Sequence, residues 1–368
     1  MLKYLVVSFF VCFFVNLAVI WFSKKAFFGI DYLNNEPQKF HKIPTPRLGG
    51  VGIFIAFLTL SLLLFFHRKE SDFLLFSASS SIVFLAGFAE DIKRKIKPSI
   101  RLLAAMCSAV LGIYLIGALL TRLDIGFIDK LLQFKLLAVI ITLIAVAGVS
   151  NSFNIIDGYN GLASMVSIII FFGLAYVSFK VNDIFLVEVS FFMIFALIAF
   201  FLLNFPFGKI FLGDGGAYFV GFMVAEVSIL LVARHKQVSA FFPLLLCIYP
   251  IFETIFSMYR RKIIRKSSAS KADALHLHTL LHKRVVPFII DPKSKKDLLY
   301  KNSATSPILW FLTTISAVPA VLFWGSREIL GAFTIFFMII YIVVYKSIVG
   351  FKSHKIASVL NLWRKNGK

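Results

Sequence analysis

Residues 184–203 read IFLVEVSFFMIFALIAFFLL, with Glu188 as their only charged residue. A helix needs about 20 apolar residues to cross the roughly 30 Å of hydrocarbon in a bilayer. The stretch therefore predicts a membrane-spanning helix. A membrane β-strand is excluded, because its residues would alternate between apolar and polar over about ten positions.

Similar stretches recur along the whole chain. Of its 368 residues, 59% are hydrophobic, 15% are charged and 44 are Phe, whereas a soluble domain carries about 25% charged residues. We expect an all-α fold, namely a polytopic integral membrane helical bundle with about eleven transmembrane helices in a single domain, residues 1–368. The expected helices cover residues 4–23, 48–66, 73–89, 102–120, 131–150, 162–179, 184–203, 216–233, 240–259, 308–324 and 329–350.

The net charge of +21 indicates topology rather than nucleic-acid binding. Eleven crossings place the two termini on opposite sides of the membrane. Most of the 39 Lys and Arg residues fall on one side, in residues 24–47, 90–101, 204–215, 260–307 and the C-terminal tail. The positive-inside rule makes that side cytoplasmic, with the N-terminus outside and the C-terminus inside. The loop 260–307 is the largest cytoplasmic segment.

Two polar motifs flank the second and third expected helices on this side. HKIPTPRLGG, residues 41–50, offers Lys42 and Arg47 as phosphate ligands. A rigid connector with two basic anchors is the alternative interpretation of this motif. AEDIKRK, residues 89–95, pairs Glu90 with Asp91 at the membrane boundary. Their mutual repulsion favours a divalent cation, and an interfacial ion-pair cluster is the alternative.

Lys93 and Arg94 in the second motif offer positive charge to an acidic substrate.

The third motif, NSFNIIDGYNGL, residues 151–162, places Asn154, Asp157 and Asn160 between two apolar spans. Such groups at membrane depth are costly unless they line a wet cavity or bind a ligand. The fourth motif, FLGDGG, residues 211–216, sets a carboxylate in a glycine run at a helix start, which suits a phosphate beside a metal ion.

The loop 260–307 carries the fifth motif, with His276, His278 and His282. Structural zinc is disfavoured because no cysteine lies in this loop, and phosphate binding or proton donation suits these histidines better. Acids also lie within or at the ends of apolar runs, at Glu188, Glu226 and Glu253. We interpret Glu226 as an interhelical hydrogen-bond partner.

The cytoplasmic face combines carboxylates, basic side chains, histidines and glycine loops. Phosphoryl transfer with Mg²⁺ requires these groups. The lipid boundary implies one lipid-borne reactant and one soluble reactant, for which a nucleotide diphosphate is the natural donor. A transporter or flippase for a polyanionic lipid is the main rival, although it would place polar residues near mid-bilayer. A CDP-alcohol phosphatidyltransferase is disfavoured because its DGxxAR pattern is absent.

Five motifs occur in one order along the chain: HKIPTPRLGG, GFAEDIKRKIKPSIR, NSFNIIDGYNGLAS, FLGDGGAYFVGF and HLHTLLHKR. Together they resemble the polyprenyl-phosphate N-acetylhexosamine-1-phosphate transferases, or glycosyltransferase family 4, in the bacterial branch that initiates O-antigen and related surface glycans. The resemblance covers about residues 40–285. It implies transfer of HexNAc-1-phosphate from a UDP-HexNAc to undecaprenyl phosphate with release of UMP. It also implies Mg²⁺, with Mn²⁺ as an alternative, and a multi-pass protein of the bacterial inner membrane with a cytoplasmic active site.

The resemblance assigns roles residue by residue. Asp91, Glu90 and Asp157 are implied to be catalytic, and Asp214 and Asp91 to bind the metal. The implied substrate-binding residues are Asn154, Asn160, His276, His278, Lys42, Arg47, Lys93 and Arg94. Beyond the bilayer and the two substrates, we keep a homodimer as a candidate assembly and expect no nucleic acid.

Three positions depart from the family pattern. Glu90 replaces the first aspartate of an Asp-Asp pair, Asn160 replaces the second acid of DGxDG, and Thr279 stands where a final histidine is common. The phospho-MurNAc-pentapeptide transferases of peptidoglycan synthesis are the alternative branch, disfavoured by their different histidine and N-terminal motifs. The sugar stays open among GlcNAc, FucNAc and QuiNAc.

Overall fold

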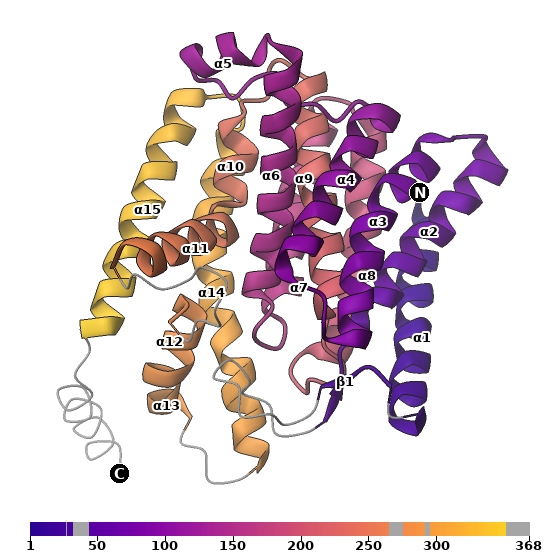
Figure 1. The fold of residues 1–368 in the computed structure, drawn as a ribbon, viewed down its shortest axis with the longest axis vertical. Helices are drawn as coiled ribbons and strands as arrows, with labels where there is room; N and C mark the ends of the chain where they lie inside the picture. Colours follow the sequence, from indigo (N-terminus) through magenta and orange to yellow (C-terminus); the bar gives the residue numbers. More distant parts are fainter. Residues whose placement is uncertain (27, 32–43, 265–274, 291–294, 351–368) are drawn as a thin grey trace.

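The structure is a computed structural model, and it describes residues 1–26, 28–31, 44–264, 275–290 and 295–350. The described part is almost entirely helical, in agreement with the expected fold class (Figure 1). Its elements are α1 (Leu2–Ala26), β1 (Ile30–Asp31), β2 (Thr45–Pro46), α2 (Gly49–Arg68), α3 (Asp72–Lys93), α4 (Pro98–Ile116), α5 (Gly126–Leu132), α6 (Lys135–Ile156), α7 (Leu162–Lys180), α8 (Ile184–Asn204), α9 (Gly213–Arg234), α10 (Phe241–Leu246), α11 (Ile248–Tyr259), the π-helix η1 (Arg260–Ile264), α12 (Leu277–Arg284), α13 (Val286–Ile289), α14 (Lys295–Leu322) and α15 (Arg327–Gly350).

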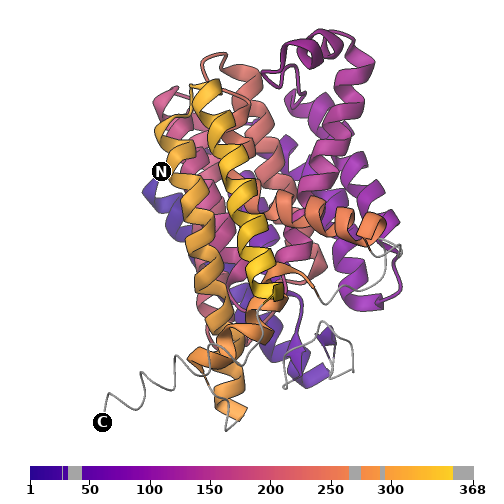
Figure 2. The same ribbon diagram turned by 90° about the vertical axis from the view of Figure 1, so that its left-hand side faces the viewer.

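Within the described residues, ten helices are long and apolar enough to cross a membrane. The expected helix over 240–259 is the exception, because it is divided at Cys247 into α10 and α11. Pro250 lacks the N–H that would bond four residues back, and its ring crowds that carbonyl. Helix α11 lies across the bundle axis in both ribbon views (Figures 1 and 2).

Helix α9 is the central element of the bundle (Figure 1). It packs against α2, α3, α4, α6, α7 and α8. Its glycines permit this approach: a Cβ on Gly50 of α2 would lie 2.2 Å from the Gly216 Cα, and one on Gly87 of α3 would lie 2.6 Å from the Gly215 Cα. Since ordinary carbon contacts are near 3.5–4.0 Å, no side chain fits at these two contacts.

The predicted polar motifs gather at one end of the bundle. Helices α3 and α6 end there, and helices α2 and α9 begin there (Figure 1). The short strands β1 and β2 pair antiparallel at the same end, with Ile30 opposite Pro46. The outer faces of the bundle carry exposed apolar side chains, such as Phe14 and Trp21 on α1, as lipid contact requires.

Candidate active site

Asp91 joins the end of α3 to the start of α9. Its Oδ1 accepts the backbone N–H of Asp214 at 2.8 Å, and its Oδ2 accepts that of Gly215 at 2.8 Å. The side chain is only 2% exposed. The first N–H groups of a helix lack partners within the helix and carry partial positive charge. Asp91 therefore caps α9 from a neighbouring helix and fixes the position of the Asp214 backbone.

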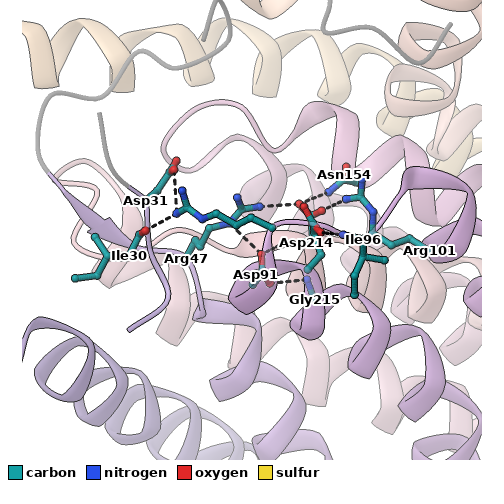
Figure 3. A network of polar contacts seen from close by, with 11 residues as sticks. Ile30, Asp31, Arg47, Asp91, Ile96, Arg101, Asn154, Asp214 and Gly215 are labelled. Carbon is teal, nitrogen blue, oxygen red and sulfur yellow. Dashed lines mark hydrogen bonds and ion pairs between the residues drawn. The ribbon is translucent and has the colours of Figure 1, made fainter. Parts of the chain in front are cut away.

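Arg47 connects two of the acids from the segment just before α2. Its Nε donates to Asp91 Oδ1 at 3.0 Å, and its Nη2 donates to Asp214 Oδ1 at 2.9 Å (Figure 3). Gly213 lies directly against Arg47, because a Cβ on Gly213 would lie 2.0 Å from the Arg47 carbonyl oxygen. Gly213 also has a φ of +76°, which disfavours any side chain at this turn.

Asp214 contacts three side chains from other elements. Besides Arg47, its Oδ1 accepts Asn154 Nδ2 at 3.0 Å, and its Oδ2 forms an ion pair with Arg101 of α4 (Figure 3). The Arg101 guanidinium lies 5.5 Å from the ring centroid of Tyr218. Arg101 was not singled out in the sequence. Its only signal was a position one turn after Pro98, at the start of a helix that follows the acidic motif.

Asp157 follows the last residue of α6, and its carboxyl interacts with Arg47 and the Gly213 backbone N–H. Burial raises the pKa of its carboxyl to about 7, while the positive charge of Arg47 and the backbone N–H of Gly213 act in the opposite direction. The negative charges of Asp91 and Asp157 also interact. The three aspartates that the sequence placed in separate motifs therefore converge at one end of the bundle.

The donor chemistry of this cluster suits Mg²⁺, which prefers carboxylate and other oxygen ligands. Asp157 and Asp214 fit best, since Asp91 already accepts two backbone N–H groups. Among the described residues, however, no three His, Cys, Asp or Glu side chains are arranged to hold a metal ion. Arg47, Arg101 and Asn154 already contact Asp214, so ion binding requires some of these contacts to be exchanged.

Glu90 and Arg94 of the second motif bond to partners other than the aspartates. Glu90 was expected beside Asp91 in catalysis, but its Oε2 accepts the Ile96 backbone N–H at 2.6 Å. Successive helix residues point about 100° apart, so adjacent acids need not share a site. Arg94 forms an ion pair with Asp31 at 3.2 Å and donates to the Ile30 carbonyl, which holds the strand pair to α3.

The outcome differs between the two lysines among the substrate-binding candidates. Lys93 is exposed at the end of α3. Lys42 lies outside the described residues, so its placement stays a prediction.

Asn160, expected to bind substrate, is instead built into the contact with α14. Its Nδ2 donates to the Pro206 carbonyl at 3.1 Å and to Ser303 Oγ at 3.3 Å. Its backbone N–H donates to Asn302 Oδ1 at 3.0 Å, and its carbonyl accepts from Ser306 Oγ at 2.6 Å. We therefore revise its role to anchoring the loop that holds Asp157.

The histidine motif forms a second polar group beside the aspartates. The rings of His276 and His278 stack with centroids 5.1 Å apart and an interplanar angle of 12°. His278 reaches the third motif, because a Cβ on Gly158 would lie 3.5 Å from its Nε2. The Nδ1 of His282 lies 3.2 Å from Thr305 Oγ1, and burial lowers its pKa to about 4, so that it is neutral at pH 7.

The fold brings these two groups next to each other, since Gly158 directly follows Asp157. The resulting end of the bundle offers buried carboxylates, guanidinium groups and imidazoles. Phosphate groups suit the guanidinium and imidazole groups, and a divalent cation suits the carboxylates. This combination serves phosphoryl chemistry, in which positioning and charge neutralisation account for most of the catalysis.

Comparison with known proteins gives consistent matches. A model of glycosyl transferase family 4 matches residues 73–232. A Bacillus subtilis (strain 168) protein, provisionally named an undecaprenyl-phosphate N-acetylglucosaminyl 1-phosphate transferase, is 25% identical over 332 residues, or 89% of this chain and 86% of its own. A Saccharolobus solfataricus protein, provisionally named a UDP-N-acetylglucosamine–dolichyl-phosphate N-acetylglucosaminephosphotransferase, is 31% identical over 61% of this chain and 69% of its own. A phospho-N-acetylmuramoyl-pentapeptide-transferase of Petrotoga mobilis is 29% identical over 61% of this chain and 73% of its own.

Proposed function

Because the chain belongs to glycosyl transferase family 4, we propose that it transfers an N-acetylhexosamine-1-phosphate from a UDP-HexNAc to undecaprenyl phosphate. The products are undecaprenyl-pyrophosphoryl-HexNAc and UMP. Relatives named for N-acetylglucosamine transfer support GlcNAc as the first donor to test. We further propose that the reaction starts the synthesis of an O-antigen or another surface glycan.

The convergence of Asp91, Asp157 and Asp214 with two arginines carries this proposal. The new bond joins an oxygen of the lipid phosphate to the sugar-bearing phosphorus of the donor, and the bond from that phosphorus to the UMP oxygen breaks. The lipid phosphate is already largely ionised at pH 7, since the second pKa of such a group is about 6. A strong general base is therefore unnecessary. Arg47 and Arg101 would bind and orient the phosphates in exchange for their contacts with Asp214.

We propose Mg²⁺ as the cofactor, with Mn²⁺ as a substitute. Asp157 and Asp214 would hold the ion, and when bound it would neutralise charge on the donor diphosphate. Asp91 continues to accept the backbone N–H groups of Asp214 and Gly215 in the first turn of α9, which fixes the Asp214 backbone. Asn154 orients the Asp214 carboxylate through its 3.0 Å hydrogen bond.

The proposed location is the inner membrane of a bacterium, with this end of the bundle in the cytoplasm. The described helices support a multi-pass membrane protein. The excess of Lys and Arg in the loops at this end supports the cytoplasmic orientation. A soluble UDP-sugar would then reach the site from the cytoplasm, and the lipid phosphate from the inner leaflet.

A donor panel tests the reaction. Purified protein in detergent is given undecaprenyl phosphate, Mg²⁺ and one donor at a time, namely UDP-GlcNAc, UDP-FucNAc, UDP-QuiNAc or UDP-MurNAc-pentapeptide, and UMP release is followed. We expect turnover with a UDP-HexNAc and its loss in EDTA. Turnover with UDP-MurNAc-pentapeptide alone would establish the second candidate, which the Petrotoga mobilis relative favours. No turnover with any donor, together with lipid transport in vesicles, would replace the proposal with a flippase.

Two substitutions connect that reaction to the site. Asp214→Asn and Asp91→Asn should each reduce UMP release by at least about 10²-fold, since each removes a charge around which the site is organised. Melting temperatures measured in the same detergent distinguish loss of chemistry from loss of the fold. Near wild-type turnover in either folded variant would remove that residue from the site.

A further inference from the structure

Glu253 lies beside the histidine motif and was not predicted to have a role there. It belongs to α11, and its side chain is 1% exposed. Its Oε1 lies 2.9 Å from His276 Nδ1 and accepts the Leu277 backbone N–H at 3.2 Å. Its Oε2 accepts the Tyr341 hydroxyl at 2.7 Å, from α15. Three elements that are distant in sequence, α11, α12 and α15, therefore meet at one carboxylate.

These contacts define the hydrogen-bonding state of the His276 ring. The Leu277 N–H and the Tyr341 hydroxyl both act as donors to Glu253, which is the arrangement that an ionised carboxylate requires. An ionised carboxylate only accepts, so Nδ1 of His276 must carry a proton and donate it. The Nε2 of His276 is then on the opposite side of the ring, 3.4 Å from an Arg261 nitrogen.

The His276 ring is also connected to the aspartate cluster through His278. It stacks on His278, whose Nε2 lies against Gly158, the residue that follows Asp157. A rotation of the His276 ring would therefore disturb the stacked pair that faces the third motif. The bond from Glu253 to Leu277 additionally fixes the start of α12, so that ring and helix are held by the same oxygen.

We propose that Glu253 is a positioning residue for the transfer reaction, which holds His276 in the Nδ1–H tautomer with the accepting Nε2 turned toward the Arg261 guanidinium. Tyr341 supports it by satisfying the second carboxylate oxygen. This inference rests on the proposed function for its kinetic part. The state of the imidazole is a separate observable that does not need turnover.

The rival explanation is that Glu253 only ties α11 to α15. A purely structural tie predicts a lower melting temperature and unchanged kinetics in the folded fraction. A positioning role predicts a change in the histidine spectrum and a lower kcat. The KM for undecaprenyl phosphate stays constant under both explanations, which makes it an internal reference.

Glu253→Gln is the informative variant, because it preserves size and removes the charge. Glu188→Gln is the matched control, since Glu188 is also a buried membrane acid, paired with Arg68 at the other end of the bundle. Each protein is labelled with ¹⁵N-histidine, and the His276 signals are assigned by their loss in His276→Gln. The kcat and both KM values are measured for the active donor of the panel.

We expect Glu253→Gln to alter the His276 tautomer signals and to lower kcat by about 10- to 100-fold, the usual effect of losing a partner that orients a functional side chain. Glu188→Gln should leave the His276 signals and the KM values unchanged. Unaltered signals, or a kcat within about twofold of wild type, would overturn the positioning role.

Tyr341→Phe keeps the inference testable if Glu253→Gln does not fold. It should lower kcat by a few-fold, since one of the three hydrogen bonds to the carboxylate is removed. A kcat equal to that of wild type would overturn the role of this cluster. If the wild-type protein shows no turnover with any donor, the proposed function fails, whereas the ¹⁵N signals still decide how Glu253 holds His276.

Discussion

Replacing Gly87 with alanine should separate the two helices that build the aspartate cluster. A Cβ at this position would lie 2.6 Å from the Gly215 Cα and 2.7 Å from the Asp214 carbonyl carbon. Carbon atoms in contact are near 3.5–4.0 Å apart, so α3 and α9 must move apart by about 1 Å. Gly87 lies one helical turn before Asp91. The two hydrogen bonds that α9 backbone N–H groups donate to Asp91, each 2.8 Å long, would then lengthen beyond about 3.5 Å and be lost.

The expected loss of activity follows from that displacement. A shift of about 1 Å in a positioned group costs about 10²-fold in rate, and hydrogen bonds to a charged group contribute about 1.5–3 kcal/mol each to stability. UMP release and the melting temperature in detergent measure both effects. Gly148→Ala is the control, because a Cβ on Gly148 of α6 meets nothing within 4 Å. Activity of Gly87→Ala within about twofold of this control would refute the argument that helix contact sets the site geometry.

Three further outcomes follow from other contacts. Burial lowers the pKa of His282 to about 4, so the folded state resists its protonation. The free energy of unfolding should therefore fall by up to about 3 kcal/mol from pH 6.5 to pH 4. The melting temperature of His282→Gln should depend less on pH than that of the wild type. Asn160→Asp should lower the melting temperature without raising turnover, because a carboxylate would face the Pro206 carbonyl that now accepts Nδ2. Glu188→Gln should cost about 2 kcal/mol by removing the buried negative charge that pairs with Arg68, with unchanged KM.

The sequence predicted the fold class, most helices and the convergence of three aspartates. Apolar blocks near 20 residues are a strong local signal, since a bilayer demands them. The aspartates were recognised because each lies in a glycine- or amide-rich motif, and five motifs in one order are specific. The division at Cys247 was missed because hydropathy does not register how Pro250 interrupts a helix.

Side-chain direction was the part that sequence could not supply. Glu90 and Asp91 are adjacent, yet one accepts from Ile96 and the other caps α9. Asn160 looks like a substrate ligand by its motif, but its partner is α14, which comes 142 residues later in the chain. Arg101 has no local signal beyond its position one turn after Pro98. Each of these placements depends on which helices become neighbours.

The glycine contacts explain how helix packing sets the chemistry of this site. Gly50 and Gly87 let the backbones of α2 and α3 contact the backbone of α9. A Cβ added at either glycine would lie only 2.2–2.6 Å from a Cα of α9. Arg47 precedes α2 by two residues and Asp91 follows Gly87 by four, so each charged group is placed by the contact beside it. A substitution at Asp214 changes one side chain. A methyl group at Gly87 displaces the start of α9, and with it the backbone N–H groups that hold Asp91.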